Sequence, residues 1–168
     1  MHQRHRKISH LSLQRLAIFL SIFLLLNGCS ASRKARQRQQ EADVVIRAAR
    51  TYMGTPYKWG GTTRSGIDCS GLTGNAFNAI KVSLPRTADA QALVGEKIKI
   101  GDLKPGDLVF FATGKKKREI THVGIVTSVK SKDDIKFIHA STSLGVVETN
   151  LFSDYYKKKF RSARRIID

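Results

Sequence analysis

Three side chains in this 168-residue chain could together carry out nucleophilic chemistry. Cys69 lies in the segment Asp68-Cys69-Ser70-Gly71, and His122 and His139 follow it along the chain. A thiolate attacks a carbonyl carbon, and an imidazole can take the thiol proton and later return it to a leaving amine. Cys69 is therefore either an inert buried residue or the nucleophile of a hydrolase.

The order of these residues favours the hydrolase. A cysteine, then a histidine, then a polar orienting residue is the order found in papain-like peptidases. We predict that His122 is the general base and that His139 orients it. Asp68 stands where an N-cap residue would, so Cys69 would begin a helix, and the helix dipole there would lower its pKa. A lone histidine in a strand is more often a core residue, so the prediction depends on all three residues occurring together.

The start of the chain resembles a bacterial export signal. Four basic residues and no acidic residue precede an apolar run over residues 16–26. This run is too short to span a bilayer, which takes about 20 residues. Leu26-Asn27-Gly28-Cys29 resembles the lipoprotein box, which implies a lipid on Cys29, and Ser30 after it implies transfer to the outer membrane. An uncleaved anchor or an ordinary secretory signal is the alternative.

Charge and cysteine usage fit an exported protein. Without residues 1–28 the chain keeps 26 basic residues against 13 acidic ones, a net charge of +13. Such a balance first suggests nucleic acid, but export argues against it and leaves either anionic envelope surfaces or a simply soluble basic surface. Cys69 would then be the only thiol outside the lipid anchor, and it has no partner for a structural disulfide.

Composition and periodicity divide the chain into three parts. Residues 1–28 are the predicted signal peptide, residues 29–41 the lipidated cysteine with a flexible basic tether, and residues 42–168 one catalytic domain. Within the domain, apolar spacing predicts helices first and strands afterwards, which indicates an α+β fold. The predicted helices cover residues 41–53, 69–79 and 87–93, and the predicted strands cover residues 107–111, 122–127, 136–139 and 145–148.

The motifs of the domain resemble, in order, those of the NlpC-type cell-wall endopeptidases. The resemblance covers residues 42–165 and rests on six blocks, which are Tyr57-x-Trp59-Gly60-Gly61, Asp68-Cys69-Ser70-Gly71-Leu72, Leu84-Pro85-Arg86-Thr87, Pro105-Gly106-Asp107-Leu108-Val109-Phe110-Phe111, His122-Val123-Gly124-Ile125 and Ile138-His139-Ala140-Ser141. It implies a papain-like fold with N-terminal helices packed on a five- to six-stranded antiparallel sheet. It also implies hydrolysis of amide bonds in peptidoglycan peptides.

The resemblance assigns roles to single residues. Cys69 is the nucleophile, His122 the base and His139 its orienting partner. Tyr57 lies beside the nucleophile and helps hold the oxyanion, together with the backbone N–H of Cys69. Asp68 and Ser70 line the site for the stem peptide. We expect no cofactor, a monomer, and a position at the outer membrane facing the periplasm.

Some readings stay open at this stage. The cleaved bond is either D-Ala–diaminopimelate or D-Glu–diaminopimelate. Arg86 is predicted to be a buried ion-pair partner within the domain and Asp107 a turn or hydrogen-bonding residue, whereas Trp59 is either a structural plug or part of the site. Three other functions compete: a lipid amidase or acyltransferase, although those forms have a permuted residue order; a zinc site, although no short ligand pair is present; and a non-catalytic envelope lipoprotein.

Overall fold

A computed structural model describes residues 32–167 of the chain. The predicted signal peptide and Cys29 lie outside these residues. The chain divides into two compact units, residues 1–37 and residues 38–168, and the fold described below is that of the second unit. No helix among residues 32–167 is both long and apolar enough to cross a lipid bilayer.

The N-terminal helix begins earlier than the sequence suggested. Residues 32–50 are helical, so the flexible tether expected over residues 29–41 is wrong from residue 32 onward. Arginine, lysine, alanine and glutamine dominate this stretch and are all good helix formers. Arg38 is buried and forms an ion pair with Asp107, so the folded unit includes residues that the predicted boundary at residue 42 left out.

Two further helices and a small hairpin precede the main sheet. The hairpin pairs β1 (Thr62–Thr63) with β2 (Gly66–Ile67). Helix α2 (Cys69–Asn78) follows directly, and the short helix α3 (Ala88–Gln91) comes after a loop. The predicted bounds of both helices were close, because N-cap residues and apolar spacing mark helix ends locally.

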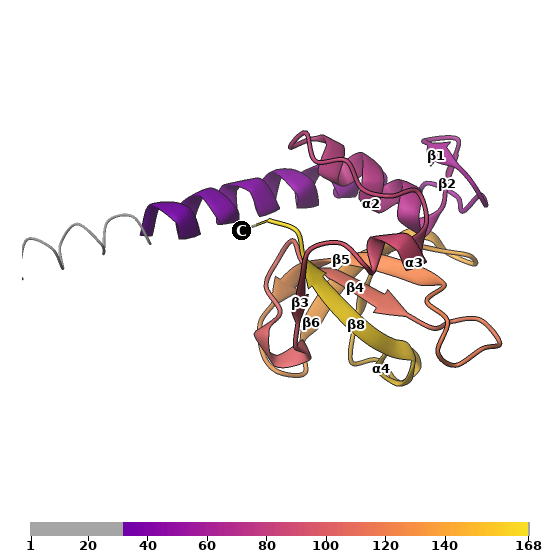
Figure 1. The fold of residues 1–168 in the computed structure, drawn as a ribbon. Coiled ribbons are helices and arrows are strands. Elements are labelled where there is room, and N and C mark those ends of the chain that lie inside the picture. Colours follow the sequence, from indigo (N-terminus) through magenta and orange to yellow (C-terminus); the bar gives the residue numbers. More distant parts are fainter. Residues whose placement is uncertain (1–31, 168) are drawn as a thin grey trace, which may run out of the picture. The chain divides into compact units, whose positions relative to one another are not determined.

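The main sheet has six antiparallel strands in the order β3-β8-β4-β5-β6-β7 (Figure 1). The fold predicted from the sequence is therefore confirmed. A 3-10 turn (Ile100–Asp102) follows β3, and helix α4 (Asp154–Lys159) precedes β8. The strands are β3 (Glu96–Ile98), β4 (Leu108–Phe111), β5 (His122–Val129), β6 (Ile135–Ser141), β7 (Gly145–Asn150) and β8 (Phe160–Arg165).

The sheet separates two apolar clusters, and β4 contributes to both. Leu108 and Phe110 point to the cluster that includes the N-terminal helix and α2. Val109 and Phe111 point to the other face, where they meet residues of β6 and β8. This alternation follows from the two-residue period of a strand, and it anchors β4 and its neighbour β5 against α2. Since α2 carries Cys69 and β5 carries His122, the same packing positions the site.

One buried carboxylate ties the N-terminal helix to the sheet. Asp107 is fully buried and accepts hydrogen bonds from Arg38 at 3.1 Å and from Arg165 at 2.9 and 2.7 Å. It also accepts the backbone N–H of Lys104 in the turn before β4. The expectation that Asp107 is a hydrogen-bonding residue is confirmed. An unpaired charge at this depth would cost several kcal/mol, so both arginines belong to the folded unit.

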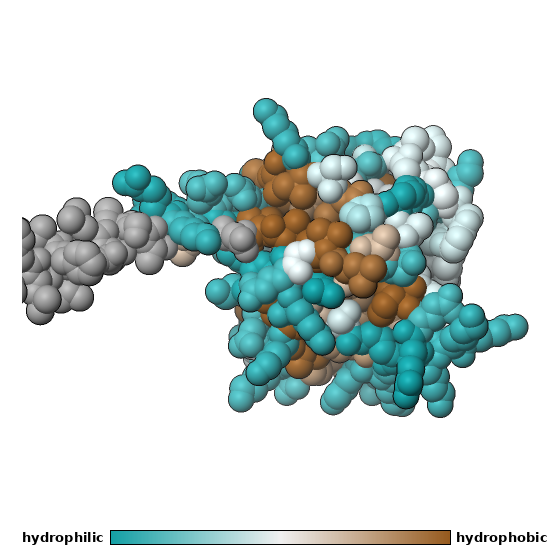
Figure 2. Space-filling view, in the orientation of Figure 1, coloured by the Kyte–Doolittle hydropathy of each residue, from teal (hydrophilic) through white to brown (hydrophobic). Residues whose placement is uncertain are grey.

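The surface of the domain is mixed. On the face shown in Figure 2, an apolar band runs between margins of hydrophilic side chains that project outward. Large apolar side chains that remain exposed among the described residues include Trp59, Leu93 and Leu144.

Candidate active site

Cys69 is the first residue of α2 and lies under the surface. Its side chain is 7% exposed, and it is the only free cysteine among residues 32–167. The helix start is held tightly, because a Cβ atom at Gly71 would lie 2.5 Å from the carbonyl oxygen of Gly61. Because Gly71 has no side chain, the loop before β1, which contains Gly61, can lie directly against the first turn of α2.

The pKa of the Cys69 thiol differs from what the sequence suggested. Burial raises it above its ordinary value, and the charge of Asp68 raises it further. Hydrogen bonds from the backbone amides of Val123 and Ser70 act in the opposite direction but do not outweigh burial. The lowered pKa expected from the helix start alone is therefore wrong for the resting state. A buried thiol becomes a thiolate when a neighbouring imidazole takes its proton and stays beside it as a cation.

Asp68 is both the N-cap of α2 and half of an ion pair. Its side chain accepts hydrogen bonds from the backbone N–H of Gly71 at 2.7 Å and of Gly60 at 2.9 Å. Arg86 donates to both carboxylate oxygens, at 3.0 and 2.7 Å, and to the hydroxyl of Ser70 at 2.9 Å. Burial alone would raise the pKa of Asp68, but the Arg86 bonds and the two amides outweigh it and lower the pKa.

The loop that carries Arg86 is fixed by a buried amide. Gln91 of α3 is fully buried, and its Nε2 donates to the carbonyl oxygens of Ser70 and Pro85. Its Oε1 accepts the hydroxyl of Thr73 at 2.7 Å. Gln91 therefore joins α2 to the Leu84–Thr87 motif. The expected role of Arg86 in an ion pair is confirmed, although its side chain is 46% exposed rather than buried.

The two histidines lie side by side because of the register between β5 and β6. Ile125 pairs with Ile138, so His122 and His139 are diagonal neighbours, a position from which side chains reach each other. Gly124 makes room between them. A Cβ atom there would lie 2.6 Å from the ring of Phe137, 2.8 Å from the carbonyl oxygen of Ile138 and 3.2 Å from the Cβ of His139.

A chain of hydrogen bonds connects the two histidine rings to Thr149. Nε2 of His122 lies 3.0 Å from Nδ1 of His139, and Nε2 of His139 lies 3.0 Å from Oγ1 of Thr149. The bond to His139 uses the Nε2 atom of His122, so Nδ1 is the nitrogen that remains for the thiol proton. The backbone amide of the next residue, Val123, contacts the sulfur of Cys69.

Aromatic rings surround the histidine pair and keep it neutral. Phe137 stacks on His139 with ring centroids 4.7 Å apart, and Tyr156 stands edge-on to His139 at 5.0 Å. Burial lowers the pKa of His122 to about 4. Burial, together with the neighbouring His122, lowers the pKa of His139 to about 3. At neutral pH both rings are therefore uncharged, and His122 can accept a proton.

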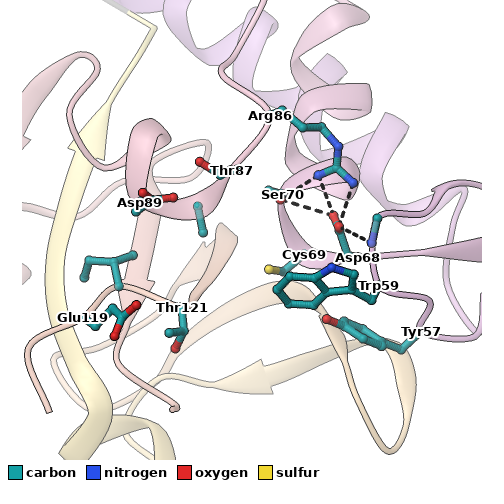
Figure 3. Close-up of a pocket in the computed structure, with 13 residues that line it drawn as sticks. Tyr57, Trp59, Asp68, Cys69, Ser70, Arg86, Thr87, Asp89, Glu119 and Thr121 are labelled. Carbon is teal, nitrogen blue, oxygen red and sulfur yellow. Dashed lines mark hydrogen bonds and ion pairs between the residues drawn. The ribbon is translucent and has the colours of Figure 1, made fainter. Parts of the chain in front are cut away.

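A pocket of about 480 Å³ opens over Cys69. Figure 3 shows Tyr57, Trp59, Asp68 and Ser70 on its nucleophile side, with Asp89, Glu119 and Thr121 opposite. Burial raises the pKa of Tyr57, and the charges of Cys69 and Asp68 add to this, so the phenol keeps its proton and can donate it. Trp59 is 86% exposed, so the reading of this residue as a structural plug is wrong.

A second pocket of about 390 Å³ lies on the histidine side. His122 lines it together with residues that mostly carry hydroxyl groups, namely Thr113, Ser141, Thr142, Ser143, Leu144, Thr149, Ser153, Tyr155 and Tyr156. The two pockets share no lining residue. Cys69 thus lines a pocket that contains charged side chains, whereas His122 lines one that contains no acidic or basic side chain besides its own ring.

The structure brings together most of the residues that the sequence singled out. Tyr57, Asp68, Cys69 and Ser70 line one pocket, and His122 and His139 are hydrogen-bonded to each other. Sequence reasoning missed Thr149, Tyr156 and Gln91, whose contacts form only in the folded chain, and no local pattern marks them. Within residues 32–167, no group of three or more His, Cys, Asp or Glu side chains could hold a metal ion.

Comparison with known proteins decides the family. Residues 54–165 match the NlpC/P60 family. The chain is 38% identical over 159 residues to the probable endopeptidase NlpC of Escherichia coli, which covers 90% of this chain and 99% of that protein. The chain belongs to the NlpC/P60 family. It is therefore a cysteine peptidase of this peptidoglycan hydrolase family, as the sequence predicted.

Other relatives of this NlpC/P60 chain support the same fold. It is 31% identical to the murein DD-endopeptidase MepS/murein LD-carboxypeptidase of Escherichia coli, with 88% of this chain and 89% of that protein covered. A crystal structure of an NlpC/P60 family protein from Bacillus cereus matches with a TM-score of 0.68 and 29% identity. That match covers 76% of this chain and 40% of the Bacillus chain, which is considerably longer.

Proposed function

We propose that this NlpC/P60 chain is a peptidoglycan endopeptidase in which Cys69 attacks an amide carbonyl of a stem peptide or crosslink. The observation that carries the proposal is the neutral, hydrogen-bonded histidine pair at the strand whose Val123 amide contacts the thiol at the start of α2. Family membership supports the reaction class, and the enzyme acts in the cell envelope. Tethering by a lipid on Cys29 at the outer membrane, and action as a monomer, are parts of the same proposal.

The reaction begins with proton transfer. Nδ1 of His122 takes the thiol proton, and the thiolate attacks the carbonyl carbon to give a tetrahedral intermediate. The N–H of Cys69 and the phenol of Tyr57 donate hydrogen bonds to the oxyanion. His122 then gives its proton to the leaving amine, and a thioester remains on Cys69. Water, activated by His122, hydrolyses the thioester and restores the thiol.

The charged side of the site orients the substrate. Asp68 and Ser70 border the stem-peptide site and hold Arg86, whose partly exposed guanidinium faces the pocket. Because Asp68 is fully engaged by Arg86 and two backbone amides, it acts through the position and charge of Arg86 and the helix start, and takes no part in proton transfer.

The test uses purified peptidoglycan and mass analysis of the soluble products. The protein should release stem-peptide fragments or separate crosslinked muropeptides, and the masses identify the bond. Cys69→Ala should release none above background. Equal product from the two proteins would exclude the proposal. A thioester that forms on Cys69 with a phospholipid but never with a muropeptide would favour the lipid amidase instead.

A further inference from the structure

The first inference concerns Thr149, whose position is set by the pairing of β6 with β7. Thr149 pairs with Phe137, and His139 pairs with Val147. Thr149 is therefore a diagonal neighbour of His139 on the same face of the sheet. Its hydroxyl oxygen lies 3.0 Å from Nε2 of His139.

The hydrogen bonds of His139 limit where its proton can be. A neutral imidazole has one N–H donor and one acceptor nitrogen. Nδ1 of His139 faces Nε2 of His122 at 3.0 Å and the phenol of Tyr156 at 3.5 Å. If Nδ1 is the acceptor, it can receive hydrogen bonds from both neighbours. The proton of His139 is then on Nε2, which donates to the hydroxyl of Thr149.

The opposite arrangement would disable the base. A proton on Nδ1 of His139 would require Nε2 of His122 to accept it. The proton of His122 would then be on Nδ1, the nitrogen that remains for the thiol. In that tautomer His122 cannot take the proton of Cys69. The nitrogen that carries the proton in His139 therefore decides which nitrogen carries it in His122.

We infer that Thr149 is a positioning residue that holds both histidines with the proton on Nε2 and so keeps Nδ1 of His122 available to the thiol. The inference rests on the proposed roles of Cys69 and His122. Thr149 touches neither substrate nor thiol in this role and acts through His139. A threonine hydroxyl can donate or accept a hydrogen bond. In this role it accepts from Nε2 of His139, and it brings no charge into the aromatic surroundings of the pair.

Two substitutions test the role. Thr149→Val removes the hydroxyl with little change of shape, and Thr149→Ser keeps it. We expect Thr149→Val to lower kcat by about 10- to 100-fold with KM nearly unchanged, and to slow alkylation of Cys69 by iodoacetamide to a similar extent, as expected for a disturbed general base. Thr149→Ser should restore both. An unchanged kcat in Thr149→Val, while Cys69→Ala is inactive, would overturn the inference and leave the proposed function standing.

Nitrogen NMR on the unaltered protein gives an independent answer. With ¹⁵N-labelled histidine, both rings should show the proton on Nε2 at neutral pH. A proton on Nδ1 of His139 would overturn the inference even if Thr149→Val failed to fold.

A second inference comes from a basic surface that two distant segments build together. The first is the loop from Lys115 to Arg118 between β4 and β5, and the second is Lys157–Lys159 with Arg161 (Figure 1). Arg161 joins them, because its guanidinium donates to the carbonyl oxygens of Lys117 at 2.6 Å and of Lys158 at 3.2 Å. We call these eight residues the basic ridge.

The charge of the ridge is only partly balanced nearby. Lys116 pairs with Glu119 at 3.4 Å, and Asp154 begins α4. Two carboxylates thus stand among eight cations. The loop leads directly into residues 119–121, which line the pocket over Cys69. A polyanion on the ridge would therefore lie next to the entrance of the site.

We infer that the basic ridge binds the anionic peptidoglycan network itself, through carboxylates of stem peptides near the one being cleaved. This inference deepens the proposed function and rests on it. Continuity with the pocket favours the substrate polymer over a membrane surface. Attraction between exposed charges is screened by salt, so binding through the ridge should weaken as ionic strength rises.

Co-sedimentation with purified sacculi tests the ridge without catalysis. In a Cys69→Ala background, replacement of Lys117, Lys157 and Lys158 by Gln should reduce binding at least tenfold at low salt and flatten its salt dependence. The matched control replaces Lys130, Lys132 and Lys136, which are exposed on the β5–β6 hairpin and on β6. Equal losses in both triple variants would overturn the inference. The inference would also be overturned if the ridge variant lost binding to vesicles of anionic phospholipids but kept its binding to sacculi.

Discussion

The nucleophile side and the histidine side of the site differ in how they handle charge. On the nucleophile side, Asp68 and Arg86 are both ionised and held together by two hydrogen bonds at the start of α2. On the histidine side, His122 and His139 are uncharged and surrounded by aromatic rings. In the proposed mechanism, the first side orients polar substrate groups with fixed charges, while the second gains and loses a proton during each turnover.

Each side also has an unfavourable effect on proton transfer from the thiol. Fixed charges near a thiol affect its pKa directly, and Asp68 raises that of Cys69. Buried histidines are neutral and therefore have a free nitrogen for a proton, but their lowered pKa makes them weak bases, so the cation formed with the thiolate must be stabilised by its neighbours. In the proposed mechanism, the site combines an orienting side that is always charged with a base that is charged only while it holds the thiol proton.

The largest effect should come from removing the base while keeping its hydrogen bond. His122→Gln places an amide nitrogen where Nε2 donates to His139, but it cannot accept the thiol proton. We expect kcat to fall about a thousandfold or more. Turnover of muropeptides and the rate of alkylation of Cys69 measure this. Retained activity would mean that another group removes the proton.

A second effect concerns stability in acid. Because the pKa values of His122 and His139 are lowered to about 4 and about 3, the unfolded chain binds more protons than the folded one below pH 6.5. The contribution of the two histidines to the free energy of unfolding is therefore at its maximum above pH 6.5, and it decreases as the pH falls towards 4. A tenfold change in proton affinity corresponds to about 1.4 kcal/mol, so the loss of stability should reach several kcal/mol.

Chemical denaturation at a series of pH values measures this slope. His122→Gln is the matched control, since it removes one of the two titrating groups and should flatten the slope between pH 6.5 and 4. An identical slope in both proteins would assign the acid sensitivity to carboxylates instead.

A smaller effect distinguishes the contributions of Asp68 and Arg86 to the pKa of Cys69. Asp68→Asn keeps an oxygen for the N-cap but removes a negative charge that raises the pKa of Cys69. The alkylation rate of Cys69 should then rise at a lower pH than in the unaltered protein. Arg86→Met removes the opposing cation and should shift the profile to higher pH. The two shifts should have opposite directions, and shifts in the same direction would contradict this account.

The smallest effect on stability is expected at Trp59. Its ring is almost fully exposed at the mouth of the pocket, so Trp59→Ala should leave Tm within about 2 °C, because surface changes seldom exceed 0.5 kcal/mol. If the ring contacts the stem peptide, KM should rise several-fold with kcat retained. A large fall in Tm would instead restore the reading of Trp59 as a structural plug.

Much of the fold and site followed from local sequence. The N-cap at Asp68 and the apolar spacing after it predicted α2 nearly to the residue. The β-rich runs predicted four of the strands of the main sheet. The edge strand β3 and its neighbour β8 were missed because basic residues hide their alternation. The N-terminal helix was placed too late, since its polar residues gave no apolar signal and its anchor, Arg38, depends on a carboxylate 69 positions away.

The sequence by itself determined the chemistry: a thiol at a helix start, two histidines after it, and the glycines that let the loops approach. Only the tertiary structure decided how these groups behave. The register of β5, β6 and β7 placed His122, His139 and Thr149 in line, and packing of aromatic rings around them made the histidines neutral. Burial likewise reversed the pKa shift expected for Cys69. Residue types and spacing are local, whereas register and desolvation depend on contacts between distant segments.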